Sequence, residues 1–272
     1  MHTSSLATSL RAHNRLFEQL RPLKATYDVF SYAAGSVLFE MGNTKVLCAV
    51  TLQAGVPHFL RGKKEGWLTA EYSLLPAATP LRTVREITIN KRSGRTIEIS
   101  RLIGRALRSI IKFDVLGEYT IFIDCDVLQA DGGTRTACVT GAYLALRQAQ
   151  ARWQQEGVIA VPLLIDELAA VSVGFHKNEQ LLLDVDFAED SELAADFNFI
   201  VTRSNKIVEI QGTAEKAPLS CEVFTQMQQL AFKGTQEIFV FFDKIQAHAQ
   251  PSDFSSFSPF LTSDIVPPFS EF

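Results

Sequence analysis

The chain has 272 residues, of which 47% are hydrophobic, and its formal net charge is −4. This apolar content is ample for a packed core and excludes a disordered chain. A net acidic chain argues mildly against a nucleic-acid partner, although the distribution of charge matters more than its sum. The four cysteines form no CxxC pair, which favours buried free thiols in a reducing compartment over disulfides or a zinc site.

The two ends of the chain differ in composition from the middle. Residues 1–14 are a polar lead-in, residues 15–247 carry the regular patterns, and residues 248–272 form a tail rich in Pro, Ser and Phe that we expect to be an extended arm. The N-terminus lacks the apolar core of a signal peptide, and no stretch approaches the roughly 18 apolar residues of a membrane span. We therefore expect a cytoplasmic protein with one large domain and no membrane partner.

The first predicted element is a β-hairpin over residues 36–41 and 44–52, with Gly42 and Asn43 in the turn. Residues 54–96 hold many Gly, Pro and Arg residues and few apolar runs, a pattern that predicts a long irregular segment that is functional or mobile. An amphipathic helix is predicted over residues 97–111. The stripe of Arg101, Arg105 and Arg108 on its polar side is most simply a solvated face.

Positive charge is concentrated around this helix. Residues 82–108 contain eight Lys or Arg residues and two acidic ones. In the irregular segment, Arg82, Arg85 and Arg92 repel one another, and a polyanion that binds them best explains such a loop.

The centre of the chain predicts a strand, a tight corner and a helix. Residues 121–128 alternate in polarity, and apolar residues recur at helical spacing from Thr136 onward. Gly132 and Gly133 allow close backbone approach, the helix start offers unpaired N–H groups, and Arg135 adds a planar cation. This pattern fits a phosphate-sized anion. It fits equally a plain corner in which Arg135 pairs with a nearby carboxylate.

A Gln-rich passage over residues 148–156 leads into the second half. Four strands are predicted there, over residues 168–175, 180–187, 197–203 and 206–211. A closing helix follows over residues 219–244, with its continuity left open at Gly234. Because hairpins followed by a helix occur in both halves, we predict an α+β fold of two lobes that share one core.

An acidic stretch follows the second of these strands. Six carboxylates lie within residues 184–196: Asp184, Asp186, Glu189, Asp190, Glu192 and Asp196. They repel one another unless a proton or cation is shared, and oxygen ligands suit Mg²⁺ or Mn²⁺. The alternative is an acidic surface loop. An anion corner, an arginine-rich loop and a carboxylate cluster together would suffice to handle a phosphodiester.

Several segments resemble, in order, motifs of the ribonuclease PH family. They include GSVLFEMGNTKVLCAV, SGRTIEISRLIGRALR, DCDVLQADGGTRTACVTGA and EDSELAADFN. The resemblance implies a ribosomal protein S5 domain 2-like fold and a hexameric ring built as a trimer of dimers. It also implies a phosphorolytic 3′-to-5′ exoribonuclease that trims the 3′ ends of tRNA precursors and other RNA and releases nucleoside 5′-diphosphates.

The same resemblance assigns individual residues. It implies that inorganic phosphate is held by Arg95, Gly133, Thr134 and Arg135. It implies that Asp190 and Asp196 hold Mg²⁺ or supply a general acid, and that Asp184 and Asp186 support the strand end. We further predict that Arg61, Arg82, Arg85 and Arg92 contact RNA.

Three departures from the family motifs concern RNA grip or assembly. The family's RxDGR motif is RAHNR here, Ala77 replaces an arginine, and Lys216 replaces a glycine. Two other functions remain open. A hydrolytic metal-dependent nuclease would have no use for the anion corner, and a non-catalytic RNA-binding or assembly subunit would be expected to lose the corner or the aspartates.

Overall fold

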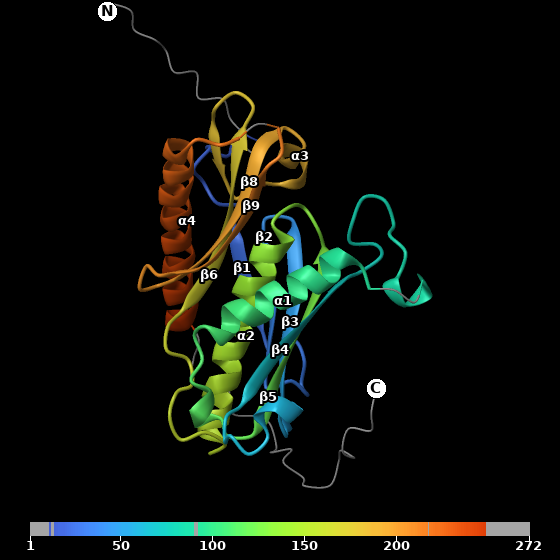
Figure 1. Cartoon of the computed structure of the whole chain (residues 1–272), viewed down its shortest axis with the longest axis vertical. Helices are drawn as coiled ribbons and strands as arrows, with labels where there is room; N and C mark the ends of the chain where they lie inside the picture. Colours follow the sequence, from blue (N-terminus) through green and yellow to red (C-terminus); the bar gives the residue numbers. More distant parts are fainter. Residues whose placement is uncertain (1–10, 12–13, 90–91, 217, 249–272) are drawn as a thin grey trace, which may run out of the picture.

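The computed structural model describes residue 11 and residues 14–89, 92–216 and 218–248. Most of the predicted lead-in and nearly all of the C-terminal tail therefore lie outside the described residues. The described part contains two β-sheets and three long helices, α1, α2 and α4 (Figure 1).

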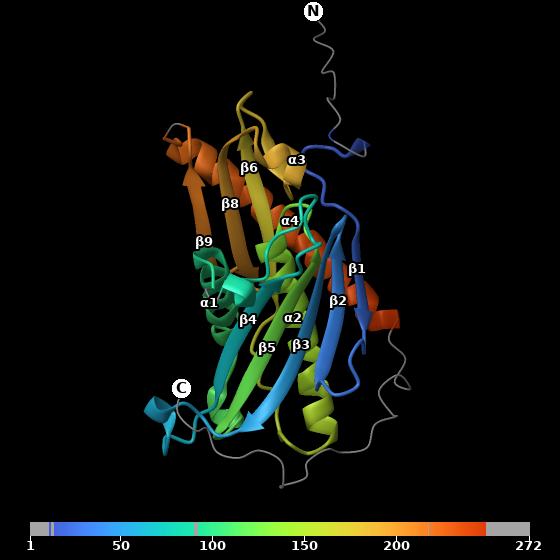
Figure 2. The same cartoon turned by 90° about the vertical axis from the view of Figure 1, so that its right-hand side faces the viewer.

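The first sheet has five strands in the spatial order β1-β2-β3-β5-β4 (Figure 2). The strands are β1 Leu23–Tyr27, β2 Gly35–Met41, β3 Thr44–Ala54, β4 Trp67–Leu74 and β5 Tyr119–Gln129. The predicted hairpin is confirmed, since β2 and β3 pair antiparallel from Met41 opposite Thr44. Gly42 takes a positive φ of 58° in the turn, which a side chain would disfavour.

The prediction of one irregular segment over residues 54–96 is wrong for β4. This strand alternates between buried Leu68, Ala70 and Tyr72 and more exposed neighbours, and it pairs parallel with β5. Parallel strands need a long crossover, which here contains α1, Gly94–Arg108. Consequently β4 and β5 end at the same edge of the sheet, where the glycine corner begins.

Helix α1 starts three residues before its predicted start. The Ser93 hydroxyl accepts a hydrogen bond from the Thr96 N–H at 3.0 Å and caps the helix. The prediction of a solvated basic stripe holds for the exposed Arg101 but not for the other two arginines, which contact the protein. Arg105 pairs with Glu209, and Arg108 lies over the Trp67 ring, 4.7 Å from its centroid.

Helix α2, Thr134–Gln155, begins directly after the glycine corner. It contains almost all of the Gln-rich passage, so the prediction that this passage is a connector is wrong. One of its polar residues is part of the core: the buried Gln148 side chain accepts a hydrogen bond from the Ser36 N–H at 2.8 Å. A buried amide with a partner is compatible with a core helix.

The second sheet has four antiparallel strands in the order β7-β6-β8-β9. They are β6 Leu168–His176, β7 Leu181–Leu183, β8 Leu193–Thr202 and β9 Ile207–Ala214. The strand predicted over residues 180–187 ends early because Asp184 takes a positive φ of 54° and Asp186 caps the short helix α3, Phe187–Asp190. Helix α4, Cys221–His248, continues through Gly234, where an added Cβ would meet Leu183 at 2.7 Å.

The two lobes share one core, as predicted. Helix α2 packs on β2 and β3 of the first sheet and on β6 of the second, while α4 covers β6 (Figure 1). One apolar cluster contains residues of both sheets and of α1, α2 and α4. The three cysteines in this core are free thiols, also as predicted. Within the described residues, no helix is long and apolar enough to cross a membrane.

Candidate active site

The glycine corner lies where the two lobes meet. Gly132 and Gly133 both have positive φ, 74° and 64°, and Gly133 is the N-cap of α2. A Cβ on Gly132 would lie 2.6 Å from the Val185 carbonyl oxygen of the second lobe. Glycine is therefore required here for both conformation and space. The corner brings the first N–H groups of α2, which have no partner within the helix, to the junction of the lobes.

Arg135 pairs with a carboxylate, one of the two alternatives for this residue. Its Nη2 donates to Glu98 Oε2 of α1 at 2.8 Å, and both side chains are partly exposed. Burial alone would raise the pKa of Glu98, but the hydrogen bond from Arg135 and the nearby charge of Arg95 lower it. An ionised Glu98 therefore holds the Arg135 guanidinium at the start of α2.

Arg95 reaches the same place from the first turn of α1. Its side chain is exposed, and it lies close enough to Tyr72, near the end of β4, to oppose the rise that burial gives the pKa of that phenol. The Tyr72 hydroxyl also lies 3.5 Å from the Thr134 hydroxyl. The structure thus gathers the predicted anion-binding residues Arg95, Thr134 and Arg135 at the ends of β4 and β5.

Asp196 of β8 faces these cations from the second lobe. Its pKa is raised to about 6, first by burial and then by repulsion from Asp190, against the opposing attraction of Arg135 and Arg95. Glu215 also repels it. Asp190, at the end of α3, is exposed. The two predicted aspartates are therefore close enough to influence each other, and Asp196 titrates near neutral pH.

No group of three or more His, Cys, Asp or Glu side chains within the described residues is placed to hold a metal ion. The available donors are the two carboxylates of Asp190 and Asp196. Mg²⁺ is commonly held by one or two carboxylates together with substrate phosphate oxygens and water, so this pair fits that cation only in company with a bound phosphate.

The predicted RNA-binding arginines do not all lie together. Arg82, Arg85 and Arg92 follow β4, on the site's side of the sheet, and all three are exposed. Arg92 pairs with the exposed Glu71 at 3.1 Å. Arg61 precedes β4, an eight-residue strand that spans about 25 Å, and so lies at the opposite end of the sheet.

Two of the three departures from the family motifs are exposed. Ala77 and Lys216 both lie in turns at the surface. In RAHNR, the two arginines are kept and buried: Arg11 and Arg15 pair with Glu189, and Arg15 also pairs with Asp184. Asn14, which replaces the motif's glycine, takes a positive φ of 58°, a conformation that Asn tolerates better than most residues.

Sequence reasoning missed four side chains of this region: Arg21, Tyr72, Glu98 and Glu215. Each is a common residue type in an ordinary strand, helix or turn, so no local pattern marks it. Only the parallel pairing of β4 with β5 and the meeting of the lobes brings them to the corner.

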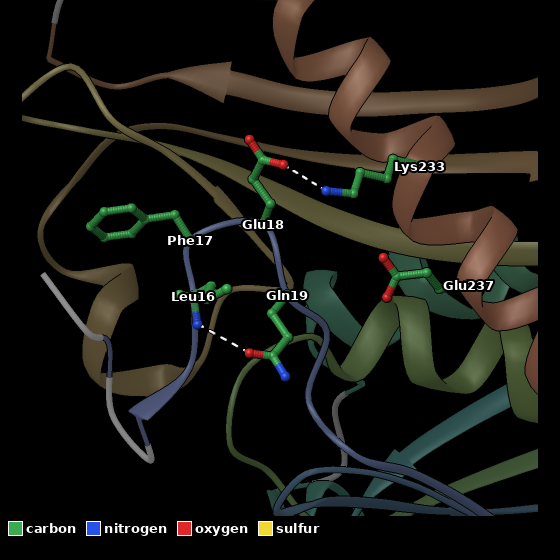
Figure 3. A pocket seen from close by; sticks show the side chains of 6 residues that line it. All are labelled: Leu16, Phe17, Glu18, Gln19, Lys233 and Glu237. Carbon is green, nitrogen blue, oxygen red and sulfur yellow. Dashed lines mark hydrogen bonds and ion pairs between the residues drawn. The ribbon is translucent and has the colours of Figure 1, made fainter. Parts of the chain in front are cut away.

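A surface hollow lies away from this corner. It has a volume of about 380 Å³ and is lined by Leu16, Phe17, Glu18, Gln19, Lys233 and Glu237. Figure 3 shows Lys233 of α4 paired with Glu18 at its edge, at 2.6 Å. A smaller hollow of about 170 Å³ lies along the arginine stripe of α1. None of the predicted phosphate-binding or catalytic residues lines either one.

Comparison with known families defines the class of protein. Residues 19–152 match domain 1 of the 3′ exoribonuclease family, and residues 166–234 match domain 2. The chain is 50% identical over 229 residues to ribonuclease PH of Bacillus velezensis, covering 84% of this chain and 94% of that protein. It is 48% identical over 233 residues to ribonuclease PH of Tropheryma whipplei, covering 86% of this chain and 94% of that protein. The chain belongs to the ribonuclease PH family of phosphate-dependent 3′ exoribonucleases.

Solved structures agree on the fold. One is the Archaeoglobus fulgidus exosome with RNA bound to the active site, with a TM-score of 0.73 at 20% identity over 86% of this chain and 93% of that chain. Another is rice Rrp46, with a TM-score of 0.69 at 19% identity over 85% of this chain and 97% of that chain. At these identities the likeness establishes the fold alone, which is the predicted ribonuclease PH-like α+β fold.

Proposed function

We propose that this chain binds inorganic phosphate at the glycine corner and uses it to shorten RNA from the 3′ end. Arg95 and Arg135 would neutralise the anion, while Thr134 and the N–H of Gly133 would donate hydrogen bonds to it. The observation that carries this proposal is the convergence of Arg95 and Arg135 on Asp196, a carboxyl group with its pKa raised to about 6. The two arginines that would bind the attacking phosphate therefore lie next to Asp196, the acid that could protonate the leaving oxygen.

The reaction needs no covalent enzyme intermediate. An oxygen of orthophosphate attacks the phosphorus of the last phosphodiester, and the bond from that phosphorus to the 3′ oxygen of the preceding nucleotide breaks. The shortened RNA leaves with a protonated 3′ hydroxyl, and the last nucleotide leaves as a 5′-diphosphate. The two arginines would stabilise charge on the transferring phosphoryl group. Because the phosphodiester bond that breaks and the phosphoanhydride bond that forms are close in free energy, the reverse addition of nucleotides from diphosphates should also run.

Two roles are proposed for the aspartates. A carboxyl group that titrates near pH 6 can protonate the departing 3′ oxygen, which fits Asp196. Asp190 and Asp196 could also hold Mg²⁺ or Mn²⁺ together with oxygens of the phosphate, and the ion would add charge stabilisation at the transferring group. With a pKa of about 6, the Asp196 carboxyl group is partly protonated near pH 6 and mostly ionised above pH 7, so it could donate a proton or bind a cation.

The proposed substrates are 3′-extended tRNA precursors and ribosomal RNA ends in the cytoplasm. Arg82, Arg85 and Arg92 would contact the RNA backbone beside the site. Arg61 would contact it at the far end of the sheet. A net charge of −4 is a poor match for RNA in a single chain. A hexameric ring, a trimer of dimers, would gather the basic loops of several copies around one opening.

The experiment incubates the protein and a 3′-extended tRNA with and without inorganic phosphate and identifies the released nucleotides. We expect shortening only with phosphate, with nucleoside 5′-diphosphates as products. Shortening in phosphate-free buffer, with monophosphates released, would indicate a hydrolytic nuclease instead. RNA binding without shortening under both conditions would indicate a non-catalytic assembly subunit.

A further inference from the structure

Arg21 lies just before β1, and its side chain is 6% exposed. It forms a bidentate ion pair with the fully buried carboxylate of Asp184: Nη2 donates to Oδ1 at 2.6 Å, and Nε donates to Oδ2 at 3.0 Å. The Arg21 backbone N–H donates to Oδ2 as well, at 2.8 Å. Such a two-pronged pair fixes the plane of the guanidinium.

The same guanidinium reaches the carbonyl side of the glycine corner. Its Nη1 donates to the Asp131 carbonyl oxygen, and its Nη2 lies 3.4 Å from that of Gly132. Thr44, fully buried, shares one of these contacts and adds another: its hydroxyl donates to the Gly132 carbonyl at 2.6 Å and accepts from the Asp131 N–H, in the preceding peptide, at 3.0 Å. The Asp131 carbonyl is therefore held by Arg21, and the Gly132 carbonyl by Arg21 and Thr44 together.

Because each peptide group is planar, fixing a carbonyl group also fixes the direction of the next residue's N–H group. In a planar trans peptide, the carbonyl of one residue and the N–H of the next point in opposite directions. Fixing the carbonyls of Asp131 and Gly132 toward Arg21 therefore directs the N–H groups of Gly132 and Gly133 away from it. Those are the N–H groups at the start of α2 that would face the phosphate.

We propose that Arg21, oriented by Asp184, is a positioning residue for phosphate binding. It does not touch phosphate; it sets the direction of the N–H groups of Gly132 and Gly133 and ties the corner to the segment that leads into α3 and Asp190. This inference rests on the proposed phosphate site, because it describes how the site's donors are aimed.

The test measures phosphate binding by calorimetry and the KM for phosphate, kcat and the KM for RNA in the Arg21→Lys variant. Lysine keeps the charge but lacks the fork that bonds Asp184 and two carbonyls together. We expect the Kd and KM for phosphate to rise at least tenfold, since misplacement of about 1 Å can cost about a hundredfold. The KM for RNA should stay within roughly twofold, because the change lies away from the basic loop.

Arg15→Lys is the matched control. Arg15 is also 6% exposed and also pairs with Asp184, at 3.3 Å, but it makes no hydrogen bond to the glycine corner within the described residues. We expect Arg15→Lys to lower the thermal midpoint much as Arg21→Lys does and to leave the Kd for phosphate unchanged. Equal rises in Kd for both variants would overturn the positioning role, because a general loosening of the network would then explain them.

Thr44→Val provides a second route if Arg21→Lys does not fold. It removes the hydroxyl that holds the Gly132 carbonyl, and we expect a smaller rise in the KM for phosphate that Thr44→Ser does not show. An unchanged KM in Thr44→Val would contradict the inference. Arg135→Ala distinguishes failure of this inference from failure of the phosphate site. If Arg135→Ala loses phosphate binding and Arg21→Lys binds normally, only the positioning role is contradicted. If Arg135→Ala binds phosphate normally, the phosphate site itself is contradicted.

Discussion

Two aspartates of the acidic stretch, Asp184 and Asp196, lie in opposite environments. At the junction of β7 and α3, Asp184 is fully buried and takes hydrogen bonds from Arg15 and Arg21. In β8, Asp196 is half-buried, faces Asp190 and Glu215, and has its pKa raised to about 6. The difference shows that position in the fold, and not residue type, separates a carboxylate that anchors structure from one that can exchange a proton.

The largest effect is expected from Asp184→Asn. The substitution removes the carboxylate that Arg21 pairs with and one of the acidic partners of Arg15, and breaking a buried ion pair costs about 3–5 kcal/mol. Chemical denaturation measures the free energy of unfolding, and Glu192→Gln, which breaks exposed pairs with His176 and Lys177, is the control. A loss no larger than that of the control would mean that Asp184 is no anchor.

The next effect is on turnover. We expect Asp196→Asn to lower kcat by about a hundredfold to ten-thousandfold, as for loss of a general acid, with RNA binding retained. A single-turnover assay with saturating RNA and phosphate measures the rate, and filter binding measures the affinity for RNA. A normal rate would remove Asp196 from the active site.

Stability should change in the opposite direction for this same variant. The folded-state pKa of Asp196, about 6, exceeds the reference value of 3.8, so the folded protein binds the proton more tightly. The contribution of Asp196 to stability is therefore greatest below pH 4 and declines as pH rises to 6. Asparagine cannot ionise, so Asp196→Asn should stabilise the protein at pH 7.5 by up to about 3 kcal/mol, and less at pH 4.5.

Thermal denaturation at the two pH values provides this measurement. The comparison between the two aspartates predicts that Asp184→Asn destabilises the protein while Asp196→Asn stabilises it at pH 7.5. Destabilisation by both variants would contradict the proposed difference between Asp184, which stabilises the fold when ionised, and Asp196, which does not.

The smallest effect is expected at the surface. Arg82→Ala combined with Arg85→Ala should raise the KM for RNA severalfold and reduce the salt dependence of RNA binding, with a slope change of about 1 for each RNA phosphate that the variant no longer neutralises. The KM for phosphate should not change. Arg101→Ala, an exposed arginine of the α1 stripe, is the control. A salt dependence equal to that of the control would place the RNA path elsewhere.

Local patterns predicted the elements whose signals are local. The β2–β3 hairpin follows from alternation around Gly42, and the glycine corner before α2 follows from its own residues. The strand β4 was missed because Gly, Pro and Arg residues flank it and its pairing is parallel to a distant strand. The early end of β7 depends on the backbone of Asp184, whose conformation is fixed by arginines far away in the sequence.

The site was predictable only where its residues stand close together in the sequence. Arg135 and Gly133 stand in one recognisable corner, and the family resemblance added Arg95, Asp190 and Asp196. Glu98 and Arg21 could not be foreseen, because an acid on α1 and an arginine before β1 acquire a role only when the lobes close around the corner.

The most direct test of the central claim follows the phosphate itself. The protein is incubated with a 3′-extended tRNA and radiolabelled orthophosphate, and the label is located in the released nucleotides. We expect wild-type protein to place the label in the β-phosphate of nucleoside diphosphates and Arg135→Ala to do so at least a hundredfold more slowly. Label incorporation by Arg135→Ala at the wild-type rate, or release of unlabelled monophosphates by the wild type, would contradict the claim.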